Sequence, residues 1–537
     1  MLYLNQKALS DTAAWEKAGI ALPTYDRAAM IAKTKAEPRW LHFGAGNIFR
    51  AFPAAVADKL LSAGKMDRGV IACEGFDFEI VDRIYAPHDD LSLAVTLLAD
   101  GSVKKEVVAS VAESVKADDA GLARLAEIFT APSLQMVSFT ITEKGYSIRR
   151  PDGSLTPAID ADMKAGPKAA GTFLARLTGL LYTRFNAGKL PLALVSMDNC
   201  SHNGDKLKAA VTEIADAWEK AGLVSEGFCA YLADEAKITF PISMIDKITP
   251  RPDANVAKML SDCGFGDTET VITSKNTYIA PFVNAEKPQY LVIEDKFPAG
   301  HPALEEGGVI FTARETVDKT EKMKVCTCLN PLHTALAVYG CMLGYTLICE
   351  EMRDPELSAM VNVIGYKEGL PVVVDPGILK PIDFIDEVVK MRLPNPFMPD
   401  APQRIATDTS QKMSVRYGET IKAYLAAGKD VKELKAIPLV IAGWCRYLMG
   451  LDDNLEPFTI SSDPLLSELQ PYLADLEIGK ACEKCVHKAL SPILSNARIF
   501  AVDLYETGLG EQVEADFLKL VAGKGAIRKT LREAFGA

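Results

Sequence analysis

The chain has 537 residues, of which 48% are hydrophobic and 24% are charged, a composition ordinary for a globular protein. Its net charge of −12 argues against nucleic acid or an anionic membrane as a partner, because both normally require a basic face. The N-terminal segment lacks a basic leader followed by an apolar run, so we expect no signal peptide, and no apolar stretch is long enough for a membrane span. Eleven scattered cysteines without a secretion signal favour reduced thiols and a cytoplasmic location.

The first half of the chain alternates short apolar segments with helical patterns. We expect strands at 39–44, 69–75, 134–142 and 190–199, and helices at 51–64 and 205–222. Leu207, Val211, Ile214 and Trp218 share one face of the second helix. Near-continuous apolar strands separated by helices are typical of a parallel sheet that is covered on both faces.

The segment "LHFGAGNIFRAF" places Gly44 and Gly46 between an expected strand and an expected helix. In a dinucleotide-binding fold the first glycine permits the tight turn, and the second lets a pyrophosphate approach the backbone amides. Asn47 follows in the same loop, Phe49 stands where a third glycine is usual, and Arg50 could supply a positive charge to phosphate. A lone G-x-G is also compatible with a plain strand–helix turn.

Two carboxylates follow the second expected strand. Glu74 ends that strand and Asp77 lies close behind it. A carboxylate at this position can accept hydrogen bonds from an adenosine ribose and repels a 2′-phosphate, which favours NAD over NADP. The alternative is that Glu74 only solvates a loop.

Polar side chains also follow the two later strands of the first half. They are Thr142, Glu143 and Lys144 after one strand, and Asp198, Asn199, His202 and Asn203 after the other. Ligands of open α/β sheets bind beyond the carboxyl ends of the strands, so these residues are candidate walls of a site. Loop caps and Asx-turns are the alternative, particularly for Asp198 and Asn203.

In the second half, after residues 289–314, helical patterns dominate, for example at 333–345, 380–393 and 432–450. A region near 298–308 that contains proline and glycine separates the two patterns. The sequence therefore predicts an α/β protein. Residues 1–300 form an NAD-binding, Rossmann-type N-terminal domain with additions, and residues 301–537 form a mainly α-helical C-terminal domain.

Residues 321–333, "EKMKVCTCLNPLH", contain one of the chain's six histidines. The pair Cys326 and Cys328 lacks the C-x₂₋₄-C spacing of structural zinc, and the C-x-x-C at 482–485 has no second pair. We therefore expect no metal. A general base is the better interpretation, because a lysine can deprotonate an alcohol when burial lowers its pKa.

Lys324, Asn330 and His333 supply an amine, an amide donor for an alkoxide and a residue that can hold a hydroxyl. Asn330 and His333 are one helical turn apart, and Glu321 lies three residues before Lys324. The alternative for Lys324 alone is a solvated surface lysine.

Several segments resemble, in the same order, those of the polyol-specific long-chain dehydrogenases, the mannitol 2-dehydrogenase and fructuronate reductase group. They are "GAGNIFRA", "TEKGY", "DNCSHNG", "FPISMIDKITP", "VIEDKFPAG" and "RLPNP", together with a lysine followed by Asn-x-x-His. The resemblance extends from about residue 40 to residue 412 and thus covers most of the chain.

The resemblance implies roles for individual residues. Lys324 matches the catalytic lysine, Asn199 and Asn330 match the pair that holds the oxyanion, and His333 matches the residue that orients substrate. Glu321 matches the carboxylate before the lysine, Asp246 an acidic residue near the site, and Arg392 a substrate-side arginine. The turn Gly44–Arg50 matches the NAD pyrophosphate loop. Lys412 and Arg392 could bind the C1 carboxylate of an aldonate.

The chain departs from the family pattern at one point. Five residues separate Lys324 from Asn330, one more than the family places there. An additional residue needs a bulge or a tighter turn to keep the amine in the same place. Lys322 is therefore an alternative base.

The expected reaction is metal-independent hydride transfer between NAD and C2 of an acyclic sugar acid or polyol. Mannonate/fructuronate is the first expectation for the substrate, and mannitol/fructose and tagaturonate are the alternatives. Two other classes stay open: an NAD-binding sensor without chemistry, and a zinc enzyme built on the cysteines and His333.

Overall fold

The computed structural model describes residues 1–536, which form two compact units. Unit 1 comprises residues 1–98 and 102–317, and unit 2 comprises residues 99–101 and the chain from 318 onward. The chain passes from the first unit to the second within helix α12 (Arg314–Met323). Among the described residues, no helix is both long and apolar enough to cross a bilayer.

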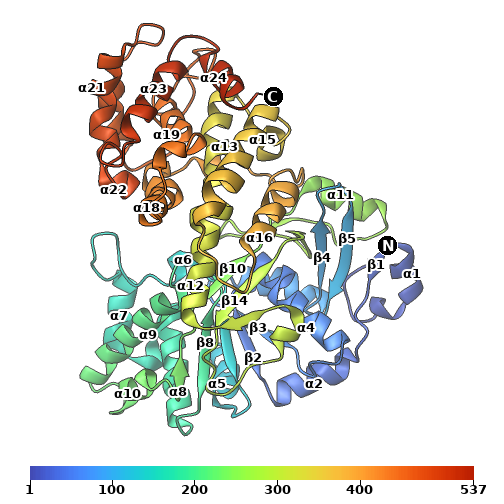
Figure 1. Cartoon of the computed structure of the whole chain (residues 1–537). Helices are drawn as coiled ribbons and strands as arrows, with labels where there is room; N and C mark the ends of the chain where they lie inside the picture. The colour runs from blue at the N-terminus through green and yellow to red at the C-terminus, as the bar shows by residue number, and fades with distance from the viewer. Residues whose placement is uncertain (537) are drawn as a thin grey trace. The chain divides into compact units, whose positions relative to one another are not determined.

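A six-stranded parallel sheet forms the centre of unit 1 (Figure 1). Its strands are β2 (Trp40–Phe43), β3 (Val70–Glu74), β6 (Val111–Lys116), β7 (Met136–Phe139), β8 (Leu192–Ser196) and β9 (Ile238–Thr239). They lie in the order β6-β3-β2-β7-β8-β9, so the order reverses between β2 and β7. This is the strand order of the doubly wound dinucleotide-binding fold. The predicted Rossmann-type domain is confirmed.

Successive side chains of each strand point to opposite faces of the sheet, so the core of unit 1 has two layers. Leu41 and Phe43 of β2 pack into one hydrophobic cluster, whereas Trp40 packs into the other. The first layer contains α5 (Leu122–Thr130), α8 (Phe173–Asn186) and α9 (Asn203–Lys220), and the second contains α4 (Pro53–Ser62). A strand that is buried on both faces must be apolar throughout, which explains the near-continuous apolar runs of these segments.

The predicted apolar face of α9 is also confirmed. Leu207, Val211, Ile214 and Trp218 are all fully buried. The remaining helices of unit 1 are α1 (Thr12–Lys17), α2 (Arg27–Ala36), α3 (Asn47–Ala51), α6 (Thr142–Gly145), α7 (Pro157–Ala165), α10 (Phe228–Ala233) and α11 (Ala254–Asp262).

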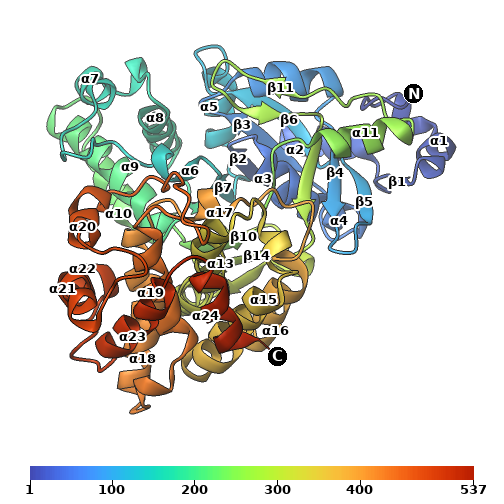
Figure 2. The same cartoon turned by 90° about the horizontal axis from the view of Figure 1, so that it is seen from above.

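Three smaller sheets are added to unit 1. A four-stranded sheet has the order β1-β5-β4-β13, with β1 (Ile20–Ala21), β4 (Ser92–Leu97), β5 (Val103–Val108) and β13 (Phe282–Glu286). The N-terminal residues lie beside it, because β1 pairs with β5 (Figure 2). The second sheet contains β10 (Ser243–Asp246), β14 (Tyr290–Glu294) and β15 (Ile310–Thr312), and the third is the hairpin β11 (Val271–Ile272) and β12 (Tyr278–Ile279).

Unit 2 is helical, and residues 318–536 contain no β-strand (Figure 1). Its helices are α13 (Asn330–Leu343), α14 (Ile348–Glu351), α15 (Pro355–Asn362), α16 (Pro381–Glu387), α17 (Pro402–Ile405), α18 (Glu419–Ala426), α19 (Ala436–Tyr447), α20 (Leu466–Leu473), α21 (Glu483–Leu494), α22 (Ala497–Phe500), α23 (Gly510–Leu520) and α24 (Ala526–Phe535). Every residue of α19 is buried, and this helix packs against α13 and α23. The predicted helical C-terminal domain is confirmed.

Unit 2 contains a buried carboxyl group that has no hydrogen-bond partner. Both oxygens of Glu351 are buried and unpartnered within the described residues. The carboxyl group occupies space that only a glycine leaves free, because a Cβ at Gly340 would lie 2.0 Å from Glu351 Oε1. Burial, followed by the charges of Asp354 and Glu350, raises the pKa of Glu351 to about 9.

This carboxyl group makes the stability of unit 2 depend on pH. The pKa of Glu351 rises from 4.5 to about 9 on folding, so the unfolded chain loses this proton first. The free energy of unfolding therefore falls as pH rises between these two values. Glu351→Gln lacks this titrating group, so its free energy of unfolding should not fall in the same way. As pH rises, the free energy of unfolding of the variant minus that of the wild type should increase by up to about 1.4 kcal/mol per pH unit. Urea unfolding of both proteins at about pH 6 and about pH 8.5 measures the difference in their free energies of unfolding. If that difference is the same at both pH values, the raised pKa of Glu351 is contradicted.

Candidate active site

The two glycines of the turn after β2 are required for different reasons. Gly44 has φ +101°, and a Cβ there would lie 2.1 Å from the Thr140 carbonyl oxygen, so only glycine fits. Gly46 has an ordinary φ of −80°, and a Cβ there would meet no described atom within 4 Å. The protein itself does not require glycine at position 46. The open space at Gly46 fits a ligand that approaches the backbone closely.

A chain of hydrogen bonds between side chains of β2, β7 and the residue after β7 supports this turn. Ser138 Oγ lies 2.7 Å from Nδ1 of His42, and Thr140 Oγ1 lies 2.9 Å from its Nε2. Thr140 in turn donates to the Gly44 carbonyl oxygen at 3.0 Å, so His42 carries its proton on Nε2. Burial lowers the pKa of His42 to about 3, which keeps the imidazole neutral. Phe49 stacks on this ring at 4.1 Å and is itself fully buried, so it supports the turn and does not face a ligand.

The structure does not place Arg50 where the sequence predicted a phosphate contact. Arg50 is 1% exposed. Its Nε donates to Ser92 Oγ, and its Nη2 donates to the carbonyl oxygens of Ala280 and Pro281. The guanidinium therefore ties α3 to the four-stranded sheet. Asn47 is partly exposed and follows in the turn, and its Nδ2 donates to the Tyr278 carbonyl oxygen at 3.5 Å. The backbone amides at this turn are therefore the groups that fit a pyrophosphate.

Glu74 and Asp77 are also buried. Glu74 Oε2 accepts a hydrogen bond from the Ala45 amide at 2.9 Å, and Oε1 accepts three more from the amides of residues 75–77. Asp77 accepts from Thr273 Oγ1 at 2.6 Å. These bonds hold the glycine turn against the end of β3. They do not support the predicted ribose contact, because the carboxylates serve the protein's own donors, and burial raises the pKa of Glu74.

The sequence analysis missed an exposed aromatic residue between these two acids. Phe76 is 69% exposed, and Lys275 Nζ lies 5.3 Å from the centroid of its ring. The β11–β12 hairpin that carries Lys275 is anchored here, since the Ser274 amide donates to Glu79 Oε1 at 2.9 Å. The adenosine of a bound dinucleotide lies beyond the end of this strand in the fold. The sequence signal that could have indicated Phe76 as a candidate ligand contact was an aromatic residue in a loop between two acidic residues.

The polar residues after β7 and β8 separate into structural and exposed groups. Asp198 accepts from the amides of Ile141 and Thr142 and from the Tyr146 hydroxyl at 2.6 Å. Asn203 is fully buried and bridges the Asp198 carbonyl oxygen to Ser243 of β10. Both residues therefore act as loop caps, as the alternative interpretation held.

Two other predicted residues lie at strand ends, one after β8 and one in the three-stranded sheet. Asn199 follows Asp198 and is exposed. Asp246 ends β10 and is 6% exposed. The structure thus places the amide predicted for the oxyanion on the accessible surface at the carboxyl edge of the sheet.

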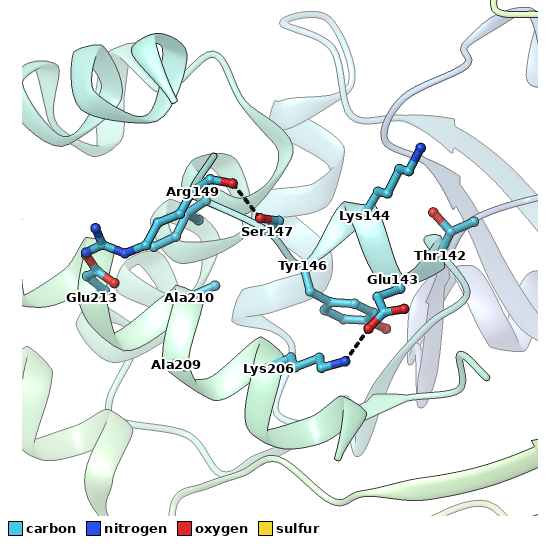
Figure 3. A pocket seen from close by; sticks show the side chains of 11 residues that line it. Thr142, Glu143, Lys144, Tyr146, Ser147, Arg149, Lys206, Ala209, Ala210 and Glu213 are labelled. Carbon is cyan, nitrogen blue, oxygen red and sulfur yellow. Dashed lines mark hydrogen bonds and ion pairs between the residues drawn. The ribbon is translucent and has the colours of Figure 1, made fainter. Parts of the chain in front are cut away.

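A cleft of about 810 Å³ opens beside this edge, between residues 142–149 and α9 (Figure 3). Lys206 Nζ contacts Glu143 Oε1 at 2.5 Å, and Arg149 pairs with Glu213. These two ion pairs each join a residue of 142–149 to a residue of α9. Thr142 and Lys144, which the sequence singled out, line the cleft.

In unit 2 the two candidate lysines differ in their surroundings. Lys324 is 3% exposed, whereas the Lys322 side chain is 50% exposed and its Nζ lies 3.1 Å from Glu419 Oε2. Glu321 is partly exposed near the end of α12. Burial therefore favours Lys324 over Lys322 as the base.

The additional residue between Lys324 and Asn330 lies in a π-helical turn. Residues Lys324–Cys328 form this turn, and the Leu329 amide donates to the Lys324 carbonyl oxygen at 3.1 Å. A π turn closes over five residues where an α turn closes over four, so it absorbs one residue without ending the helix. Asn330 then begins α13. This is the bulge that the spacing required.

His333 lies on the first turn of α13, next to an acid. Its Nε2 is 3.5 Å from Asp400 Oδ2 and has no hydrogen-bond partner within the described residues. Burial lowers the pKa of His333; Asp400 opposes this shift, whereas Arg404 and Arg416 add to it. Asp400 also pairs with Arg404. The imidazole is thus a neutral group with one buried ring nitrogen available.

The two predicted substrate-side cations have different environments. Arg392 is 4% exposed at the end of a π-helical turn, Val388–Arg392. Lys412 is partly exposed, and its ammonium group donates to the carbonyl oxygens of Thr407 and Ile405. Burial, followed by repulsion from Arg416, lowers the pKa of Lys412.

The cysteines do not form a metal site within residues 1–536, where no group of three or more potential ligands is found. Cys326, Cys328 and Cys341 are separately buried thiols. Cys482 and Cys485 are joined by a disulfide at the start of α21, so the expectation of reduced thiols is wrong for this pair.

Comparison with known proteins gives consistent results over both units. A family model described as the mannitol dehydrogenase Rossmann domain matches residues 38–306, and one described as the mannitol dehydrogenase C-terminal domain matches residues 316–521. A Thermotoga maritima protein named D-mannonate oxidoreductase is 51% identical over 99% of this chain and 99% of its own. A Cereibacter sphaeroides mannitol 2-dehydrogenase is 30% identical, with 84% of this chain and 88% of that protein aligned.

Two solved structures are similar over nearly the whole chain. D-sorbitol dehydrogenase in substrate-free form has a TM-score of 0.78 at 25% identity, covering 95% of this chain and 97% of that one. The Pseudomonas fluorescens mannitol 2-dehydrogenase ternary complex with NAD and D-mannitol has a TM-score of 0.69 at 25% identity, covering 99% of both chains.

The different constraints on the two glycines can be tested with a pair of variants. Gly44→Ala should lower the free energy of unfolding by about 2 kcal/mol or more, because the turn must move away from Thr140. Gly46→Ala should leave stability nearly unchanged and raise the Kd for NADH at least about tenfold, since its methyl group enters the ligand's space. Urea unfolding and titration of NADH fluorescence measure the two effects. Equal losses of stability, or an unchanged Kd for Gly46→Ala, would refute the distinction.

Proposed function

Because the chain belongs to the mannitol dehydrogenase family, we propose that it is an NAD-dependent, metal-independent oxidoreductase that interconverts D-mannonate and D-fructuronate. The observation that carries the substrate is the similarity, over the full length of both chains, to the Thermotoga maritima protein named D-mannonate oxidoreductase. Mannitol/fructose and tagaturonate are the alternatives, and the first corresponds to the more distant relatives named mannitol 2-dehydrogenase. A small sugar acid is the proposed partner, and the cytoplasmic location stays a prediction.

Unit 1 supplies the groups that fit NAD. The open side of Gly46 and the backbone amides of Gly46 and Asn47 would hold the pyrophosphate, and Phe76 would meet the adenosine. When bound, the nicotinamide accepts the hydride from the secondary alcohol or returns it to the ketone.

Unit 2 supplies the proton transfer. During oxidation Lys324, as the neutral amine, takes the hydroxyl proton as the C–H bond breaks, and during reduction its ammonium returns that proton to the oxygen. Because Lys324 is 3% exposed, little bulk water competes for the proton. The family resemblance assigns the amides of Asn330 and Asn199 to the developing oxyanion, and we keep this assignment as part of the proposal.

His333 is assigned to the substrate's hydroxyl groups. The neutral ring has an unpartnered Nε2, which can donate to or accept from a hydroxyl. Asp400 Oδ2 lies 3.5 Å from this same nitrogen, so a hydroxyl bound here would also lie near the carboxylate. Glu321, three residues before the base, and Asp246 at the end of β10 remain candidates for proton relay and substrate contact.

Initial rates with NADH test the choice of substrate. We expect fructuronate to be reduced faster than tagaturonate or fructose. Faster reduction of fructose would replace the proposal by a mannitol dehydrogenase. No turnover of any of the three, with NADH still bound, would favour the sensor alternative.

The assignment of the base gives a matched pair of variants. Lys324→Ala should lower kcat by about 10²- to 10⁴-fold, because the general base is lost, while the Kd for NADH stays close to that of the wild type. Lys322→Ala removes an exposed amine that pairs with Glu419 and should keep nearly full activity. Stopped-flow turnover and NADH titration measure both. The opposite order of activities would transfer the role to Lys322.

A further inference from the structure

A group of basic side chains surrounds the first turn of α13. It contains Arg404, Lys412 and Arg416, and the sequence analysis did not single out Arg416. Arg416 is joined to this turn directly, because its Nη1 donates to Thr334 Oγ1, and Thr334 follows His333 in the chain. Thr334 Oγ1 also donates to the Asn330 carbonyl oxygen at 3.0 Å. Arg416 thus contacts the same turn that presents Asn330 and His333.

Two members of this group have no direct ion pair, although the more distant carboxylates Asp408 and Asp463 act on Lys412. Arg404 pairs with Asp400, but no carboxylate within residues 1–536 lies within ion-pair distance of Arg416 or of Lys412. Lys412 and Arg416 are one turn apart, since the Arg416 amide donates to the Lys412 carbonyl oxygen at 3.0 Å. Burial lowers the pKa of Arg416 to about 10. Burial, together with repulsion from Arg416, also lowers the pKa of Lys412.

Two neighbouring cations without a carboxylate in direct contact are costly for a folded protein, because a partly buried charge needs a close counter-charge. An anionic ligand supplies one. The hydrogen bond to Thr334 uses only one of the five N–H donors of Arg416, which leaves a planar pair of donors of the kind that binds a carboxylate in a bidentate manner.

We infer that Arg416, assisted by Lys412, binds the substrate's carboxylate and is the residue that selects a sugar acid over a neutral polyol. The inference rests on the proposed function and extends it, because it assigns the discrimination to one side chain. Fructuronate and fructose differ only at the chain end remote from the reacting C2, where one carries a carboxylate and the other a hydroxymethyl group. A guanidinium that recognises this end acts on one substrate and not on the other.

Arg416→Met tests the inference with these two substrates. We expect kcat/KM for fructuronate to fall about 10- to 100-fold, mainly through KM, while kcat/KM for fructose stays nearly unchanged. Lys390→Met is the control for a lost positive charge in unit 2, because Lys390 is exposed and pairs with Asp386; it should change neither value. Should Arg416→Met fail to fold, Arg416→Lys allows the same comparison, since it keeps the charge but loses the planar pair of donors.

A second variant separates recognition from support of the helix. Thr334→Val removes the hydrogen bond to Arg416 and keeps the cation. If Arg416 only supported α13, Arg416→Met and Thr334→Val would both lower kcat/KM for fructose as much as for fructuronate. That result would overturn the inference. Unchanged kinetics of Arg416→Met would overturn it as well. The wild-type preference between the two substrates tests the proposed function separately, so failure of one is distinguishable from failure of the other.

Discussion

A lysine side chain that is almost fully removed from water at the start of a π-helical turn is the feature on which the proposed function of this chain depends. Lys324 is 3% exposed, and the turn Lys324–Cys328 takes up the residue that separates this sequence from its family pattern. Without that turn the additional residue would rotate Lys324 away from the face that Asn330 and His333 share. The π-helical turn therefore accommodates the altered spacing in the way that the proposed chemistry requires.

The same relation between local geometry and ligand chemistry holds in unit 1. The glycine turn after β2 is fixed from three sides: by Glu74 through the Ala45 amide, by Thr140 through the Gly44 carbonyl oxygen, and by the stack of Phe49 on His42. Glu74, His42 and Phe49 are buried and Thr140 is partly buried, and their contacts serve the backbone of the turn. What remains accessible at the turn is a row of amides beside Gly46, which is the part of the turn that a pyrophosphate contacts in this fold.

Much of the architecture could be predicted because burial imposes periodicity on the sequence. The strands at β2, β3, β7 and β8 and the face of α9 follow directly from apolar patterns. The π-helical turns could not be predicted in this way, since their side-chain pattern over five residues resembles that of an α-helix. The spacing between Lys324 and Asn330 gave the only signal, and it came from the family resemblance.

The differences between the expected and the observed contacts in the site have a common physical origin. Glu74 and Arg50 were expected to face a ligand, and both instead bind groups of the protein itself, which are brought close only by the tertiary structure. Phe76 and Arg416 were missed for the converse reason, because their exposure and their lack of a counter-charge appear only when distant segments are assembled. Sequence patterns thus identify the turn or helix that carries the chemistry, whereas the partner of each polar side chain must come from the structure.

Chemical rescue tests the role of Lys324 most directly. In Lys324→Ala, primary amines added to the solution should restore fructuronate reduction, and the rescued rate should depend on the pKa of the amine, as expected for a proton donor and acceptor in the transition state. Tetramethylammonium, which carries charge but no proton, should restore nothing. Equal rescue by this ion, or no rescue by any amine while NADH still binds, would contradict the account.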